Sequence, residues 1–137
     1  MRDAIEFTGV ISRADKIRLM QRCKLYLSPS RYEGFGLAIL EAMSCGAPMI
    51  SSRVGALPEV VGDAGLLLDE TTPQTIGDAA NMLLDRDEYR IQMSEWARAR
   101  ACGLFPLSRR RDGLSQVLNS IFPDPTKVDS GIFRSQM

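Results

Sequence analysis

Short apolar segments alternate with longer amphipathic segments along most of this chain. The short segments have the length and composition of strands, and they lie at residues 5–10, 25–27, 47–51 and 65–69. In the segments between and after them, apolar residues recur every three or four positions, which indicates helices; these are residues 12–23, 36–45, 57–61, 72–84, 87–102 and 108–122. Strands that alternate with helices pair in parallel through right-handed crossovers. The pattern therefore predicts an α/β fold with a parallel sheet.

Several of the expected helix ends carry capping residues. Thr72 followed by Pro73 is typical of a helix start, because a hydroxyl there accepts from the first amides and proline suits the first helical position. Ser12, with an acid three residues later, is a weaker start signal. Gly46 and Pro48 are typical of a helix end. Past residue 122 no periodicity continues, and residues 123–137 are expected to be a disordered tail.

The turn between the strand at 25–27 and the helix at 36–45 has the most informative chemistry. Strand, glycine turn and helix together present backbone N–H groups at a helix N-terminus, where an anionic phosphate is favoured. Glu33 and Glu41 bracket this turn. At about 1.5 Å per residue they lie up to roughly 12 Å apart if the path is helical, and farther apart if it is partly extended, too far to share a proton. Since carboxylates repel phosphate, we expect each to bind hydroxyls on either side of it, as a nucleotide-diphosphate sugar would supply.

In their context these residues resemble a known family. The run from Glu33 to Met43 (EGFGLAILEAM), with CGAPMI at 45–50 and LPEV at 57–60, is similar to the donor-binding half of retaining glycosyltransferases of GT-B fold. This group, glycosyl transferases group 1, is related to glycogen synthase and to bacterial mannosyl- and glucosyltransferases. The resemblance runs from about residue 7 to 105. It implies a Rossmann-like parallel sheet flanked by helices, the latter part of a GT-B C-terminal domain over residues 1–122.

The resemblance also implies roles for single residues. Glu33 would contact hydroxyls of the transferred sugar and stabilise the charge that develops at its anomeric carbon, which makes it the expected catalytic residue. Glu41 would accept hydrogen bonds from the nucleotide ribose. Backbone amides would meet sugar and diphosphate oxygens, and they come from Gly34, Phe35, Gly36 and Leu37. The donor would be a UDP-, GDP- or ADP-sugar, and neither a metal nor a cofactor is expected.

Each assignment has a plainer alternative. Glu33 fits a solvated loop acid, and Glu41 an exposed helix residue. Gly34 and Gly36 fit turn glycines with positive φ. Glu59 fits either a helix cap or the lining of the base and ribose pocket.

The basic residues are concentrated late in the chain and have two interpretations. They are Arg98, Arg100, Arg109, Arg110 and Arg111. The plainer interpretation is a solvated face balanced by nearby acids. The other is peripheral contact with an anionic membrane surface, to which each charge would contribute on the order of 1 kcal/mol.

Composition excludes several classes of function. The chain has 137 residues, 17 basic and 17 acidic side chains and no histidine. A net charge of zero supplies no general attraction to nucleic acid, and the lack of histidine removes Ser-His and Cys-His nucleophiles. An odd set of cysteines (Cys23, Cys45 and Cys102) indicates reduced thiols rather than a metal cluster.

No signal peptide is evident, and no uncharged run approaches the about 20 apolar residues of a spanning helix. We expect a cytoplasmic location, which would also allow contact with the cytoplasmic face of the membrane.

A GT-B enzyme has two Rossmann-like domains with the reaction in the cleft between them, and this chain fits only part of one. The N-terminal acceptor domain is the expected missing partner, as are the Arg and Lys that neutralise the diphosphate. We therefore expect the isolated chain to have little or no transferase activity. The alternative is a degenerate, non-catalytic transferase domain that serves in assembly, since an open sheet edge favours a homodimer. A dinucleotide-binding domain is disfavoured because no G-x-G-x-x-G opens the helix.

Overall fold

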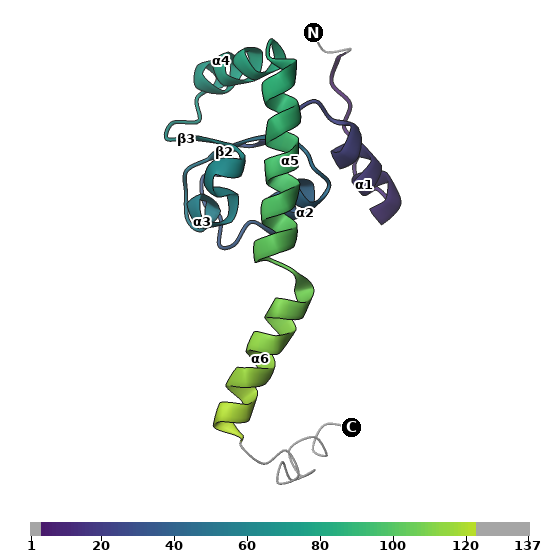
Figure 1. The fold of residues 1–137 in the computed structure, drawn as a ribbon. Helices are drawn as coiled ribbons and strands as arrows, with labels where there is room; N and C mark the ends of the chain where they lie inside the picture. Colours follow the sequence, from purple (N-terminus) through teal and green to yellow (C-terminus); the bar gives the residue numbers. More distant parts are fainter. Residues whose placement is uncertain (1–3, 123–137) are drawn as a thin grey trace. The chain divides into compact units, whose positions relative to one another are not determined.

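The computed structural model describes residues 4–122, so the predicted tail at 123–137 lies outside the described residues. The chain divides into two compact units, Met1–Leu104 and Phe105–Met137. The first unit contains the sheet and the helices around it, and the described part of the second contains helix α6 (Leu107–Ile121) (Figure 1). The expectation of a family domain over residues 1–122 stays a prediction.

The sheet has three parallel strands in the order β1-β2-β3. The strands are β1 (Tyr26–Ser28), β2 (Met49–Ser52) and β3 (Leu66–Leu68). They are joined through α2 (Leu37–Ser44) and through α3 (Leu57–Val61) with the short 3-10 helix η2 (Gly62–Ala64). In the register, Leu27 lies opposite Ile50, and Ile50 opposite Leu66. Parallel neighbours require such crossover connections, and the predicted α/β fold with its Rossmann-like parallel sheet is confirmed.

The predicted strand at residues 5–10 is wrong. This segment forms no strand in the structure, and its apolar side chains are exposed, Phe7 by 94% and Val10 by 105%. A strand is stabilised by hydrogen bonds to a neighbour. Among the described residues the sheet consists of β1, β2 and β3 only, so this segment has the composition of a strand without a partner.

One cluster of core residues joins the sheet to the two longest helices of the first unit, α4 (Pro73–Leu84) and α5 (Asp87–Leu104). Ile50 of the central strand packs with Ala79 and Leu83 of α4 and with Met93 of α5. Leu83 is fully buried and Met93 is 2% exposed. Figure 1 shows that α5 runs past the sheet and that α4 lies close to one end of α5. Every member of the cluster belongs to an apolar position of the sequence pattern, so the pattern identified this core correctly.

Capping residues begin two helices where the sequence indicates a start. The Thr72 hydroxyl accepts from the Thr75 amide at 3.1 Å, and the Thr75 hydroxyl accepts from the Thr72 amide at 3.0 Å. Ser12 accepts from the Asp15 amide at 3.1 Å and begins α1 (Arg13–Arg22). Each bond satisfies an amide that has no acceptor inside its own helix.

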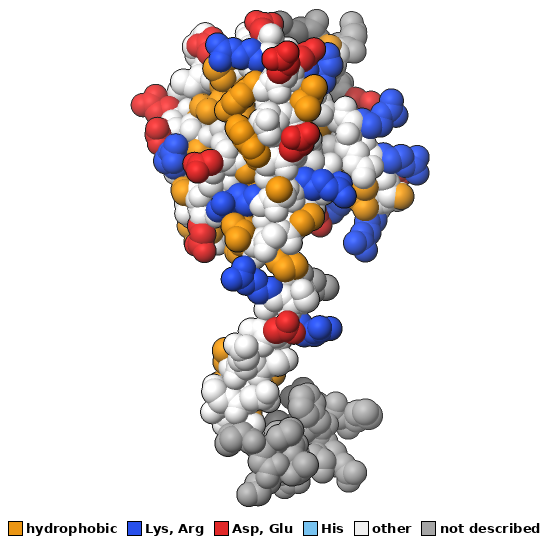
Figure 2. All heavy atoms as spheres, viewed as in Figure 1, with side chains coloured by type: hydrophobic (Ala, Val, Ile, Leu, Met, Phe, Trp, Pro, Cys, Tyr) orange, Lys and Arg blue, Asp and Glu red, His pale blue; other side chains and the backbone are white. Residues whose placement is uncertain are grey.

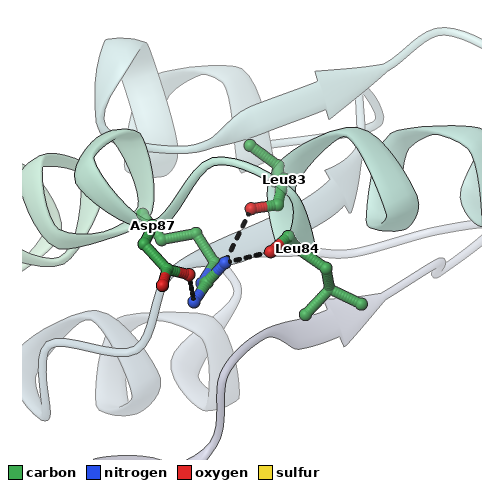
Figure 3. Close-up of polar contacts among 4 residues, drawn as sticks. Leu83, Leu84 and Asp87 are labelled. Carbon is green, nitrogen blue, oxygen red and sulfur yellow. Dashed lines mark hydrogen bonds and ion pairs between the residues drawn. The ribbon is translucent and has the colours of Figure 1, made fainter.

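Two arginines of α5 bind the C-terminal carbonyls of other helices. Arg90 donates to the carbonyls of Leu83 at 3.0 Å and Leu84 at 2.6 Å, and its guanidinium also pairs with Asp87 (Figure 3). Arg100 donates to the Val60 carbonyl at 2.9 Å. A cation at a helix C-terminus satisfies the last carbonyls and is favoured by the helix dipole. These contacts fix α5 against the ends of α4 and α3.

Candidate functional site

The candidate site is the turn between β1 and α2, at the carboxyl end of β1. In open α/β sheets, ligands bind outside the carboxyl ends of the strands. The turn lies against the end of β2: the Ser52 hydroxyl donates to the Ser30 carbonyl at 2.6 Å, and the Ala56 amide donates to the Glu33 carbonyl at 3.3 Å. The position of Glu33 is therefore set by two strand ends together.

Gly36 makes the turn into α2 possible. Its φ is +88°, in the left-handed region, and it occupies the N-cap of α2 without a side chain to cap the helix. A side chain here would be strained, and a Cβ would lie 2.7 Å from Leu57 Cδ2. The predicted positive φ is confirmed at Gly36, but it is wrong at Gly34, which is not among the glycines with positive φ in the described residues.

The Glu33 carboxylate already lies at the helix N-terminus. Its Oε1 accepts a hydrogen bond from the Gly36 amide at 3.0 Å. In the structure this amide is thus capped by the protein's own acid, and its contact with a donor oxygen stays a prediction. The reason for the capping is electrostatic, because the amides of a first turn favour any nearby anion. The Glu33 carboxylate is such an anion, and it caps the N-terminus of α2.

The neighbouring residues of the turn are open to solvent. A Cβ added to Gly34 would meet nothing within 4 Å, and the Leu37 side chain is 62% exposed. The Phe35 side chain is 44% exposed. Neither the backbone angles of Gly34 nor crowding around it therefore requires a glycine at this position. It leaves the backbone of the turn accessible to a ligand.

Glu41 forms an ion pair that the sequence pattern did not reveal. Lys16 Nζ of α1 lies 2.8 Å from Glu41 Oε2, and the two side chains are 41% and 52% exposed. An exposed pair of this kind contributes about 0–1 kcal/mol. No spacing rule connects two residues on separate helices, so Lys16 could not be found from sequence. Glu41 remains open enough to accept a hydroxyl while it keeps this partner.

The charges of both acids act on the phenol of Tyr26. Burial raises the pKa of its phenol, and the negative charges of Glu41 and Glu33 raise this pKa further, while Lys16 lowers it. Charges act on a side chain in this way only at short range. Glu33 and Glu41 therefore both lie within electrostatic reach of this phenol.

The raised pKa of Tyr26 predicts a loss of stability in alkali. Above pH 10, the ordinary pKa of the phenol, the unfolded chain releases this proton more readily than the folded chain. The free energy of unfolding therefore falls as pH rises through the folded-state pKa. Phenylalanine at position 26 should reduce this fall, as measured by urea midpoints between about pH 9 and 11. Tyr32→Phe, at a side chain 83% exposed, is the control and should behave as the wild type; equal behaviour of the two variants would contradict the prediction.

The other candidate groups are dispersed. Cys23 and Cys45 are partly buried, Cys102 is exposed, and burial raises the pKa of the Cys23 thiol. Within residues 4–122, no three cysteines or acids gather as metal ligands. Arg100 donates to the Glu59 carbonyl at 2.6 Å, so its guanidinium binds the backbone of α3. On the face in Figure 2, basic and acidic side chains both occur over the helices of the first unit.

Comparisons with known proteins agree with the fold and the family. The parallel sheet and its flanking helices make this a Rossmann-like domain of GT-B type. Residues 1–100 match the model of the family described as glycosyl transferases group 1, and the chain belongs to this family. The resemblance expected from the Glu33–Met43 run is confirmed.

Among curated relatives, the O-antigen chain mannosyltransferase B of Escherichia coli is 44% identical over 86 residues, 63% of this chain and 23% of the relative. The D-inositol 3-phosphate glycosyltransferase of Corynebacterium glutamicum is 49% identical over 93 residues, 66% of this chain and 22% of the relative. The chain thus spans less than a quarter of the length of either.

Solved structures show the same likeness. Sucrose-phosphate synthase from Thermosynechococcus elongatus has a TM-score of 0.83 at 27% identity, over 88% of this chain and 31% of that one. Anabaena HepE, solved in complex with UDP-glucose, has a TM-score of 0.73 at 28% identity, over 79% of this chain and 30% of that one. None of the helices described for this chain has the length and apolar character needed to cross a membrane.

Proposed function

We propose that this chain binds a nucleotide-diphosphate sugar and presents it for retaining glycosyl transfer by a larger enzyme. The observation that carries the proposal is the Glu33 carboxylate at the N-terminus of α2, 3.0 Å from the Gly36 amide, beside the open backbone of Gly34. Membership of the glycosyl transferases group 1 family supports it. The structural neighbour solved with UDP-glucose supports the class of ligand.

The geometry suggests how a donor would enter. The diphosphate is a stronger anion than a carboxylate and would replace Glu33 at the first-turn amides of α2. The displaced Glu33 side chain would then accept hydrogen bonds from sugar hydroxyls. Glu41, farther along α2, would accept from the ribose hydroxyls. In the transition state, the Glu33 carboxylate would stabilise the positive charge at the anomeric carbon.

The rest of the reaction would depend on parts of the protein outside these residues. We propose that an acceptor domain and the cations that neutralise the leaving diphosphate come from there, and that the 137-residue chain alone has little transferase activity. No metal is needed in this scheme, because fixed cations would take its role. A cytoplasmic location and contact with the membrane face stay predictions.

A titration of the isotopically labelled chain tests donor binding. UDP-glucose, GDP-mannose and ADP-glucose should be added separately while the amide signals are followed. One of them should shift the amides of Gly34 to Leu37 and leave those of α4 in place. Shifts confined to another surface would contradict the proposed site.

Gly34→Ala provides a sharper version of this test. Alanine fits the backbone angles and the open space at this position, so stability should be unchanged or higher by about 0.4–1 kcal/mol. Donor binding should nevertheless weaken about tenfold, because the methyl group would block the backbone from the ligand. Gly77→Ala, where a Cβ also meets nothing within 4 Å, is the matched control. Unchanged donor affinity in Gly34→Ala would argue against a ligand at this turn.

Self-association is a second candidate function, favoured by the open edge of β1. This strand pairs only with β2 in the described residues, and a groove of about 260 Å³ lies between it and α1. Leu19 and Leu27 line this groove and are 52% and 46% exposed. Unpaired edges invite pairing with another copy. Light scattering of the purified chain distinguishes the two functions: a stable dimer without a response to nucleotide-sugars supports assembly instead of donor binding.

A further inference from the structure

We infer that residues 52–56, at the end of β2, hold Glu33 in position for sugar recognition, and that Gly55 is the positioning residue on which this depends. The consequence for donor binding rests on the proposed function. The positioning itself rests on contacts in the structure. These residues belong to neither the predicted donor-binding turn nor the helix that follows it.

Two backbone carbonyls of the donor-binding turn receive hydrogen bonds from this segment. The Ser52 hydroxyl, on a side chain 2% exposed, donates to the Ser30 carbonyl at 2.6 Å. The Ala56 amide donates to the Glu33 carbonyl at 3.3 Å. The first bond holds the beginning of the turn and the second holds Glu33 itself. Ser52 is the last residue of β2 and Ala56 follows it closely, and the backbone of β2 pairs with strands on both sides.

Gly55 allows this close approach. Its φ is +53°, in the left-handed region, and a Cβ built on it would overlap the Glu33 carbonyl oxygen and lie 3.1 Å from the Glu33 carbonyl carbon. The clash is with backbone, which cannot rotate away as a flexible side chain could. A residue with a side chain here would therefore have to push Glu33 outward or lose the bond from Ala56.

The position of the Glu33 backbone matters because its carboxylate is placed with little tolerance. The bond from the Gly36 amide to Glu33 Oε1 is 3.0 Å long, and such a bond is largely lost beyond about 3.5 Å. Recognition of hydroxyls likewise needs groups held to within about 0.5 Å. Glu41 lies on α2 and is not bonded to residues 52–56. Disturbing this segment should thus impair binding of the sugar more than binding of the nucleotide.

Gly55→Ala is the first test, with Gly77→Ala as its matched control. In Gly55→Ala the Gly36 amide signal should move and exchange its hydrogen faster, because its acceptor has shifted. UDP-glucose should lose at least about tenfold in affinity while UDP loses less than about threefold. Gly77→Ala should leave all three readouts unchanged. A general weakening of structure would lower the affinities for UDP and UDP-glucose together and would overturn the inference.

Ser52→Ala is a milder variant for the case in which Gly55→Ala does not fold. Ser51→Ala is its control, since the adjacent Ser51 is equally buried and donates at 3.1 Å to the Ser28 carbonyl, inside β1 rather than in the turn. Both variants lose one buried hydrogen bond and should lose similar stability. Only Ser52→Ala should lower the affinity for UDP-glucose relative to UDP. Equal ratios in the two variants would overturn the inference.

The same measurements separate this inference from the proposed function. If the wild type binds GDP-mannose or ADP-glucose instead of UDP-glucose, that sugar and its free nucleotide replace UDP-glucose and UDP in these measurements. If it binds none of the three, the proposed donor role fails. The positioning of Glu33 is then decided by the Gly36 amide alone. A Gly36 signal that is unchanged in both Gly55→Ala and Ser52→Ala would overturn it, and a displaced signal in either would support it.

Discussion

Glutamine at position 33 is expected to weaken binding of a nucleotide-sugar about 10- to 100-fold and to leave binding of the free nucleotide within about twofold. The reason is the loss of a charged acceptor: hydrogen bonds to a charged group contribute about 1.5–3 kcal/mol, more than those to a neutral amide. Glutamine keeps the size of the side chain, and its amide oxygen can still accept from the Gly36 amide. The fold of the turn should therefore survive, so that the change reports on the charge.

Two further variants make this expectation specific, with calorimetric titration of nucleotide and nucleotide-sugar as the measurement. Glu70→Gln removes a charge outside the predicted site and should change neither affinity. Glu41→Gln should weaken nucleotide and nucleotide-sugar by the same factor, because the ribose is common to both. If Glu33→Gln behaved like Glu41→Gln, Glu33 would not be the sugar-binding acid, and the assignment of roles along the turn would be wrong.

Features set by neighbouring residues were predictable from the sequence. Thr72 and Pro73 indicated the start of α4, and the glycine turn before α2 indicated a left-handed residue, which the structure places at Gly36. Such signals depend on the chain within a few positions, because capping and turn angles are local. The family could also be recognised from the sequence, because the residues Glu33–Met43 that carry the resemblance are consecutive.

Features that join distant parts of the chain were not predictable. Lys16 and Glu41 are separated by 25 positions, Ser30 and Ser52 by 22, and Val60 and Arg100 by 40. Which partners meet depends on how the helices lie on the sheet, and neither composition nor periodicity records that. The wrong prediction of a strand at residues 5–10 has the same cause. Its residues favour an extended chain, but strand formation is decided by a neighbour that the segment itself does not specify.

Leu57→Ala is expected to cost about 2–5 kcal/mol of stability, the usual range for a buried leucine. The side chain is fully buried, and the cavity left behind would face Gly36 and the core side of α3. A domain of this size has only about 5–15 kcal/mol to lose, and each kcal/mol lowers Tm by about 4–8 °C. We therefore expect Tm to fall by about 10 °C or more in thermal unfolding followed by circular dichroism. Leu84→Ala, at a side chain 41% exposed, should change Tm much less.

Leu57 and Gly36 occupy adjoining space, so their substitutions should not be additive. Gly36→Ala alone would bring a Cβ to 2.7 Å from Leu57 Cδ2 and would force alanine to adopt a φ of +88°. Removing the Leu57 side chain first relieves the clash and leaves only the backbone strain, about 1–2 kcal/mol. The double variant should therefore be more stable than the sum of the single losses predicts, by about 0.5–3 kcal/mol. Strict additivity would mean that contact with Leu57 does not shape the turn that holds Glu33.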